Sequence, residues 1–206
     1  MNHASFVSAI LRASDEATLR GLLNEVCRAA DTGFAALACI TESLWITCQV
    51  LDRIDFGLNI GDELELQTTV CNDVLAFGRS VIVDNVDADA VWRQHPVPLM
   101  HGFKSCASFP VVLDDGRLFG TLCTIDMEPR QLSAPATVAR LRMLSDQAGR
   151  ILSRRIAASV RQNLQFAPAN DDHCNDGDQA EADLDPHRGG AHHRTSSPSA
   201  SEHRPL

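Results

Sequence analysis

One segment constrains the fold of this chain more than any other, the run SCASFPVVLDDGRLFGTLCTID at residues 105–126. Two apolar runs flank an Asp-Gly pair at residues 115–116, which is a strong signal for a β-hairpin. Neither predicted strand has a polar face, although an antiparallel strand with one wet face alternates apolar and polar residues. The hairpin therefore predicts a sheet that is covered on both faces, by helices on one side and by a pocket wall on the other. Simple alternation divides the second strand into two sets, Leu118 and Leu122 on one face and Phe119, Cys123 and Ile125 on the other.

Composition narrows the class of protein. The chain has 206 residues, enough for one domain with tails, and a formal net charge of −9. An acidic balance disfavours a broad basic surface for nucleic acid or anionic lipid. No apolar run approaches the roughly 18–20 residues that cross a bilayer, and the N-terminus lacks the pattern of a signal peptide. We expect a cytoplasmic protein that binds neither nucleic acid nor membrane.

The pattern of the seven cysteines also favours a cytoplasmic protein. Their number is odd, they are scattered, and no two form a CxxC pair. Six lie in apolar or amphipathic segments, where a free cysteine behaves as a small hydrophobe. Disulfide frameworks belong mostly to small secreted domains, so we interpret these residues as reduced thiols.

The first half of the chain reads as alternating helix and strand signals. Helical spacing runs over residues 5–30, with Ser14 as an N-cap. Residues 34–41 and 44–51 form a predicted hairpin, and residues 52–65 a loop. A short helix is expected over residues 68–77, ending at Gly78, and a buried strand over residues 81–83. In residues 90–103 we expect a packed loop, because Pro96 and Pro98 interrupt any helix; its residues expected to be buried are Trp92, Leu99, Met100 and Phe103.

A long helix is predicted after the hairpin. Ser133 and Pro135 open it, and an unbroken helix to Phe166 would be about 45 Å long. Such a length exceeds what is needed to cover one sheet, so we expect the helix to pair with one in a second subunit, along a seam of Leu141, Leu144, Ala148, Ile151, Arg155 and Ala158. Two shorter helices that fold back on the core are the alternative.

Composition also predicts the domain boundaries. We expect an N-terminal helical segment (1–13), a sensor-type domain (14–155), the end of the long helix (156–166) and a tail (167–206). The tail is dense in Asp, Gly, Pro, Ser and His, and such a segment cannot bury enough apolar surface to order itself. Its scattered histidines are interpreted as incidental composition.

The order of elements, together with particular residues, resembles the GAF domain family of small-molecule sensors. The similarity is greatest from Glu65 to Asp126, where the hairpin carries the family's spaced pattern of Ser105, Pro110, Gly116, Gly120, Leu122 and Asp126. This resemblance implies an α+β fold, an antiparallel sheet with the N- and C-terminal helices on one face and a loop-roofed pocket on the other. The chain is similar to the sensor region of GAF-containing histidine kinases. It carries no phospho-acceptor helix or Gly-rich ATP segment, so kinase activity is not inferred.

Four of these residues have physical reasons for their positions. Pro110 removes a ladder donor, so it should lie at a strand end, an edge or a bulge. Gly116 permits the positive φ of a tight turn, and Gly120 clears space for a neighbouring backbone or a ligand. Asp126 is expected to end the strand and to accept backbone hydrogen bonds. These are structural roles and indicate no activity.

Residues of the loop, the hairpin and the short helix form the candidate ligand site. The histidines His95 and His101 flank the Pro-rich segment and suggest a polar and aromatic rim for a small anionic or aromatic ligand; the alternative is a surface loop with two solvated histidines. We predict no catalytic residues and no metal site, and name no cofactor. The predicted ligand-binding residues are Cys71, Trp92, His95, His101, Phe103, Ser105, Cys106, Thr121 and Cys123. A bilin is not expected, because the Cys-His dipeptide of the bilin-binding subgroup is absent.

The function predicted from sequence is a non-catalytic, dimerising sensor. Binding of an unidentified small molecule would be passed to the terminal helices or to a signalling partner such as a histidine kinase, through closure of residues 84–103 onto the pocket. Two alternatives stay open. One is a purely structural dimerisation module. The other is an enzyme like free methionine-(R)-sulfoxide reductase: Cys71 lies near one cysteine position of that branch, but residues 80–103 contain no cysteine, and the reaction also needs a resolving thiol. Cys106 and Cys123, on neighbouring strands, are a possible facing pair.

Overall fold

The computed structural model describes residues 16–165, and within them the strands form one six-stranded antiparallel sheet. Its order is β3-β2-β1-β6-β5-β4. The α+β architecture predicted from the sequence is confirmed. The N-terminal segment, the Ser14 cap and the tail lie outside the described residues. The strands are β1 (Phe34–Ile40), β2 (Leu44–Asp52), β3 (Glu63–Glu65), β4 (Val81–Val83), β5 (Ser105–Val112) and β6 (Leu118–Asp126).

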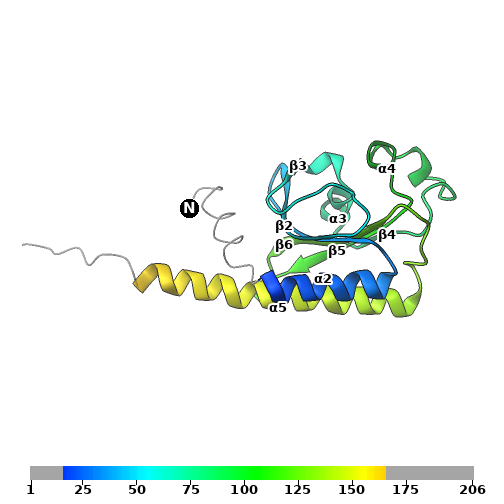
Figure 1. Ribbon diagram of the computed structural model, residues 1–206. Helices are drawn as coiled ribbons and strands as arrows, with labels where there is room; N and C mark the ends of the chain where they lie inside the picture. Colours follow the sequence, from blue (N-terminus) through cyan, green and yellow to red (C-terminus); the bar gives the residue numbers. More distant parts are fainter. Residues whose placement is uncertain (1–15, 166–206) are drawn as a thin grey trace, which may run out of the picture. The chain divides into compact units, whose positions relative to one another are not determined.

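Two helices cover one face of this sheet, as expected (Figure 1). Helix α2 (Glu16–Ala30) buries an apolar stripe that includes Leu19, Leu23 and Val26. Helix α5 (Pro135–Gln165) runs beside it without a break. Its 31 residues span about 46 Å at the usual rise per residue. The single long helix is thus confirmed, and the alternative of two shorter helices is excluded.

The seam predicted on α5 has a different use from the one expected. Leu141, Leu144 and Ala148 are almost fully buried in the core between α5 and the chain's own sheet. At Gly149 the helix lies so close to β5 that a Cβ atom would be 2.1 Å from the carbonyl oxygen of Val112. Up to Leu152, which is also buried, the stripe therefore serves intramolecular packing. For Leu141, Leu144 and Ala148 the expectation of contact with a second subunit is therefore wrong.

The β5–β6 hairpin contains a bulge that strict alternation did not predict. Leu118 pairs with Val112 and Gly120 pairs with Val111, so Phe119 is an extra residue in β6. The bulge places Phe119 on the helix-covered face together with Leu122, since an extra residue shifts the alternation by one position. Cys123 and the residues after it keep their predicted face. The assignment of Phe119 to the opposite face is therefore corrected.

Three of the four structural positions in the hairpin are explained by close backbone geometry. Gly116 has a φ of 84°, as a tight turn requires. A Cβ on Gly120 would lie 1.9 Å from the carbonyl oxygen of Ala38, so this residue permits the close approach of β1. Pro110 lies beyond the part of β5 that pairs with β4, where β5 has a strand partner on one side only. These positions agree with the roles predicted for them.

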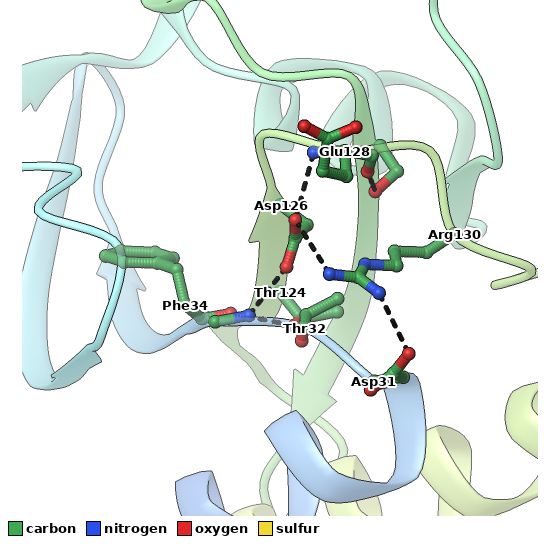
Figure 2. Close-up of polar contacts among 9 residues, drawn as sticks. Asp31, Thr32, Phe34, Thr124, Asp126, Glu128 and Arg130 are labelled. Carbon is green, nitrogen blue, oxygen red and sulfur yellow. Dashed lines mark hydrogen bonds and ion pairs between the residues drawn. The ribbon is translucent and has the colours of Figure 1, made fainter.

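The fourth position, Asp126, ties several elements together at the end of β6 (Figure 2). Its carboxylate accepts hydrogen bonds from the backbone N–H groups of Gly33 at 2.8 Å and Glu128 at 2.9 Å. Arg130 donates to the same carboxylate at 3.3 Å and to Asp31 at 2.9 Å. Asp126 therefore joins the end of α2, the start of β1 and the segment that leads to α5. The predicted strand-ending role is confirmed.

Residues 90–103 are not a loop throughout. They contain a 3-10 turn η2 (Trp92–Gln94) and a helix α4 (Pro96–His101). Both prolines lie in the first turn of α4, where backbone N–H groups have no helical partner and a missing donor is tolerated. The Nδ1 atom of His95 caps this turn by accepting from the N–H of Val97 at 3.3 Å. Leu99 and Met100, which were expected to be buried, are 70% and 62% exposed.

The segments before β4 also differ in detail from the expectation. Residues 52–65 end in the short edge strand β3 and are not loop to their end. The helix expected over residues 68–77 is divided into a 3-10 turn η1 (Leu66–Thr68) and the helix α3 (Cys71–Phe77). Gly78 ends α3 in the left-handed conformation, with its N–H bonded to the carbonyl of Val74, as predicted. Figure 1 shows α3 and α4 on the side of the sheet opposite α2 and α5.

Candidate functional site

A small cavity lies on the face of the sheet opposite α2 and α5. Its floor is formed by β1, β2 and β6, and its cover by residues 54–62, η1, α3 and α4, which we call the roof. The cavity has a volume of about 40 Å³. Most of its wall is aliphatic or aromatic. The lining residues are Phe34, Trp45, Phe56, Leu58, Leu64, Thr68, Thr69, Val70, Cys71, Val97, His101, Phe103, Cys123 and Ile125.

Phe56 occupies much of the space beneath the roof. Its ring centroid is 4.9 Å from that of Phe34 on the floor and 6.0 Å from that of His101 on α4. The space that remains holds one or two molecules of the size of water. Pockets for metabolites are usually several hundred Å³ in volume. Any larger molecule must therefore displace Phe56 and the roof segment that carries it.

The roof segment is held at its start by Asp52. The carboxylate accepts from the backbone N–H of Ile54 at 3.0 Å and of Gly57 at 2.9 Å. Burial by itself would raise the pKa of Asp52, but the backbone hydrogen bonds from Gly57 and its neighbours outweigh burial and lower that pKa. Gly57 has a φ of 95°, a conformation that suits glycine. The start of the segment is thus held by hydrogen bonds to Asp52, and the ring of Phe56 fills part of the space between the segment and the sheet.

Where α3 of the roof meets β5 and β6 of the sheet lies a compact group of sulfur and hydroxyl atoms, which we call the sulfur–hydroxyl cluster: Cys71, Ser108, Thr121 and Cys123. The sulfur of Cys71 is 3.2 Å from that of Cys123. The hydroxyl of Ser108 lies 3.4 Å from the first sulfur and 3.2 Å from the second. Thr121 donates to Cys71 at 3.1 Å. These residues come from α3, β5 and β6, and all are almost fully buried.

The orientation of one proton in this cluster follows from Trp45. Its indole Nε1 can only donate, and it donates to the hydroxyl oxygen of Thr121 at 3.1 Å. The Thr121 hydrogen is then free to point at the Cys71 sulfur. Burial would raise the pKa of Cys71, but hydrogen bonds from Cys123, Ser108, Thr121 and Thr69 outweigh it and lower the pKa. Hydrogen bonding to Cys71, together with burial, raises the pKa of Cys123. Cys71 is therefore the more acidic thiol of the pair and Cys123 the less acidic one.

The other cysteines among residues 16–165 are in a different environment. Burial raises the pKa of Cys39 to about 11 and that of Cys48 to about 12. It also raises the pKa of Cys27 and of Cys106. The facing pair suggested for Cys106 and Cys123 is not formed, because β5 and β6 pair these residues with Ile125 and Ser108 instead. Cys71 on α3 is the neighbour of Cys123.

The predicted ligand-binding residues divide into two groups by position. Cys71, His101, Phe103 and Cys123 line the cavity. Thr121 lies behind them in the sulfur–hydroxyl cluster, and Cys106 is buried under the same roof. The remaining three lie elsewhere. The rings of Trp92 and His95 lie in tilted contact beside β4, with centroids 4.6 Å apart, and His95 Nε2 is 3.9 Å from the carboxylate of Asp73. Ser105 donates its hydroxyl proton to the carbonyl of Glu128 at 2.8 Å.

Sequence reasoning missed most of the apolar lining. Phe56 and Leu58 lie in a segment predicted to be loop, and Phe34 and Trp45 lie in the two strands of a predicted hairpin, with no role at a site assigned to them. A detectable signal was present, since two large apolar side chains in a Gly-containing loop require a surface against which to pack. Among residues 16–165, no three His, Cys, Asp or Glu side chains are arranged to hold a metal ion. No helix in that range is both long and apolar enough to span a bilayer.

Comparison with known proteins gives a consistent result. Residues 16–153 match the family model described as GAF domain. No curated protein matches the chain. Among solved structures, the blue-light absorbing form of the PixJ GAF domain from Thermosynechococcus elongatus is similar, with 12% identity and a TM-score of 0.56 over 73% of this chain and 90% of its own.

Two further structures extend the range of functions found on this fold. The GAF domain of a phosphoenolpyruvate-protein phosphotransferase from Acinetobacter has 17% identity and a TM-score of 0.52, over 80% of this chain and 99% of its own. Free methionine-R-sulfoxide reductase from Neisseria meningitidis, solved in complex with its substrate, has 19% identity and a TM-score of 0.52, over 79% and 95%. At such identities the likeness establishes the fold alone.

Proposed function

Because the chain belongs to the GAF domain family, we propose that it is a non-catalytic sensor module whose cavity takes up a small molecule. The observation that supports this most is the cavity itself, placed between the sheet and a separate roof. The helix-covered face needs no such roof, since two long helices close it. A cover built from short segments is easier to displace than one built from long helices, because it buries less apolar surface.

The lining indicates the class of ligand. Aromatic and aliphatic side chains dominate it, with His101 and two threonines as the polar groups that could orient a bound molecule. A small aromatic or branched aliphatic compound with one polar group fits these walls best. Such a molecule would take the place of the Phe56 ring between Phe34 and His101.

A route from the roof to the terminal helix supports the signalling part of the proposal. Segment 84–103, which contains α4, begins at Asp84. The Asp84 carboxylate accepts from the backbone N–H of Ser133 at 2.7 Å and from its hydroxyl at 2.5 Å, just before α5 begins. The Asp84 carbonyl accepts from the N–H of Arg130 at 2.9 Å. Movement of segment 84–103 would therefore displace the residues at the start of α5. A ligand shifts the equilibrium between two conformations of this segment only to the extent that it binds them with different affinity.

The output of the module is proposed to be a homodimer, joined through α2 and the part of α5 beyond Leu152. That part of α5 continues for more than three turns after the buried stripe ends. The protein would act in the cytoplasm and pass the signal to a partner such as a histidine kinase. Multi-angle light scattering tests the dimer: a molar mass of two chains at micromolar concentration is expected, and one chain at high concentration would contradict it.

Ligand uptake is tested with Phe56→Ala and indole as the probe. Removing the ring enlarges the cavity, so we expect indole to raise the melting temperature of Phe56→Ala more than that of the unmodified chain. The matched control is Leu75→Ala, because Leu75 is 43% exposed on α3 and does not line the cavity; its response to indole should equal that of the unmodified chain. Equal responses of all three proteins would contradict a cavity that admits ligand. Native mass spectrometry of protein purified from its own host then identifies the natural occupant.

A second candidate function is favoured by one observation. Reduction of free methionine sulfoxide needs an attacking thiolate and a resolving thiol, and the structure brings Cys71 and Cys123 within 3.2 Å. Turnover of free methionine-(R)-sulfoxide, coupled to NADPH through thioredoxin, decides the matter. Turnover that is lost in Cys71→Ala and kept in Cys27→Ala would replace the sensor proposal, whereas absence of turnover supports it.

A further inference from the structure

The two cysteines of the sulfur–hydroxyl cluster differ from an ordinary pair of buried thiols in three respects. Their sulfur atoms are 3.2 Å apart, although the residues are 52 positions apart in the chain. Four contacts with protein hydroxyl groups converge on them, two from Ser108 and two from Thr121. Both side chains also line the cavity, whereas Cys27, Cys39 and Cys48 lie in the core on the other face of the sheet. Among residues 16–165, this pair is thus the one place where two neighbouring thiols, hydroxyl groups that contact them and a cavity occur together.

We propose that Cys71 and Cys123 form an oxidisable dithiol that a small hydroperoxide converts to a disulfide. This inference does not depend on the sensor function. It assigns the pair as a site of reversible oxidation, with Cys71 as the attacking sulfur and Cys123 as the resolving one. The class of co-substrate is a hydroperoxide, of which hydrogen peroxide is the smallest member.

The chemistry balances in two steps. In the first, the Cys71 thiolate attacks one peroxide oxygen, the O–O bond breaks, and a sulfenic acid forms while the departing oxygen takes a proton and leaves as water or an alcohol. In the second, the Cys123 sulfur attacks the sulfenic sulfur, the S–O bond breaks, and hydroxide leaves as water with the proton of Cys123. In sum, the two thiols lose two electrons and two protons and become a disulfide. Hydrogen peroxide is reduced to two molecules of water, and an organic hydroperoxide is reduced to one molecule of water and one of the alcohol.

The hydrogen bonds assign the roles. Trp45 fixes Thr121 as a donor toward Cys71, and a sulfur that receives hydrogen bonds carries negative charge most readily. The lowered pKa of Cys71 and the raised pKa of Cys123 are in accord with this order. Cys106, buried nearby, has a pKa raised by burial, with the negative charge of Cys71 as a smaller contribution. Cys106 is therefore expected to be a poorer nucleophile than Cys71.

Space and geometry favour a small oxidant. The cavity of about 40 Å³ admits a molecule little larger than water without movement of the roof. A bulky organic hydroperoxide would have to displace Phe56 first. Closing the disulfide then shortens the sulfur–sulfur distance from 3.2 Å to about 2.05 Å. This draws the start of α3 toward β6 and removes the hydrogen bonds of both thiols, so the floor of the cavity changes on oxidation.

The experiment uses the full chain, reduced, freed of reductant and treated with hydrogen peroxide at a few equivalents. Digestion under non-reducing conditions followed by mass spectrometry is expected to identify a peptide pair joined through Cys71 and Cys123, lighter by two hydrogens and separated again by dithiothreitol. A disulfide to a different cysteine as the main product, or sulfinic acid without any Cys71–Cys123 bond, would overturn the proposal. This mapping needs no variant, so it does not depend on whether a variant folds.

Variants then test the roles. Cys71→Ala should abolish consumption of the first equivalent of peroxide, and Cys123→Ala should leave Cys71 as a sulfenic acid that dimedone traps. Cys27→Ala is the matched control, a buried cysteine on the other face, and should react as the unmodified chain does. Thr121→Val keeps both sulfurs and should slow the reaction severalfold. Equal rates in Cys71→Ala and Cys27→Ala would contradict the assignment. The indole experiment uses no oxidant, so failure of one proposal is distinguishable from failure of the other.

Discussion

On the helix-covered face of the sheet, leucines from α2 and α5 are almost fully buried in one apolar layer. On the opposite face, the cover consists of short helices and an irregular segment, and beneath it lie a cavity and the sulfur–hydroxyl cluster. The cluster of buried apolar residues on the helix-covered face is the larger of the two, so burial there is expected to contribute more to stability. The contrast indicates that one face provides most of the stability and that the other is able to open locally.

The cysteines repeat this contrast on a smaller scale. Cys39 and Cys48 lie together in the helix-covered core, and burial raises the pKa of both. Cys71 and Cys123 are buried to a similar extent, but hydroxyl groups surround them and the pKa of Cys71 is lowered. The pKa of Cys123 is raised, so Cys71 alone differs from the other buried cysteines of residues 16–165, and burial is not what distinguishes it. The local hydrogen-bond donors decide which thiol is the most acidic.

The largest effect is expected on the helix-covered face. Leu144→Ala should lower the free energy of unfolding by roughly 2–5 kcal/mol, because it leaves a void in a packed core. Its neighbour Met143 is 45% exposed, so Met143→Ala is the control and should change the free energy by less than about 0.5 kcal/mol. Urea unfolding followed by circular dichroism measures both. Equal losses would mean that α5 is not the main cover of the sheet.

A second variant tests how tightly α5 contacts β5. Replacing glycine by alanine within a helix usually adds stability, and Gly21→Ala on α2 should do so by roughly 0.5–1 kcal/mol, since nothing lies within 4 Å of its Cβ position. Gly149→Ala should instead cost about 1–3 kcal/mol, because its Cβ would collide with the backbone of Val112. The same unfolding assay compares them. If Gly149→Ala were the more stable of the two, the close contact between α5 and β5 would be refuted.

The smallest loss of stability is expected in the roof. Phe56→Ala should cost about 1–2 kcal/mol, less than a fully buried phenylalanine, because Phe56 is half-buried and the roof segment can relax. The denaturant dependence of unfolding should stay the same, since the exposed area hardly changes. A loss as large as that of Leu144→Ala would show that the roof belongs to the main core.

Much of the fold could be predicted from the sequence because the signals are local. The Asp-Gly turn, the helical stripe of α2 and Gly78 as the end of α3 depend on a few adjacent residues. The bulge at Phe119 depends on the register with β5, which no pattern within β6 reveals. The helix α4 was missed because Pro96 and Pro98 suggested a break, although both are tolerated within a first turn. The helical structure of this segment depends on the position of its prolines in the first turn, and hydrophobic periodicity does not reveal it.

The site was predictable only in part for a related reason. Cys71 and Cys123 were both candidates, but the contact between them joins α3 to β6 and depends on how the roof folds over the sheet. The sequence suggested Cys106 as the partner of Cys123, because it lies on the neighbouring strand. Register placed Ser108 opposite Cys123 instead. Contacts between segments distant in sequence can be predicted only once the three-dimensional arrangement is known, whereas turns and caps can be predicted from adjacent residues.

The central claim, that the roof opens while the helix-covered face stays closed, is tested most directly by native-state hydrogen exchange. The amides of Gly57 and Gly102, bonded to Asp52 and to the carbonyl of Pro98, should exchange through local opening, with rates that hardly change at low denaturant. Amides in the buried part of α5 around Leu144 should exchange only on global unfolding, with rates that rise steeply with denaturant. Equal protection and equal denaturant dependence in the two regions would contradict the account.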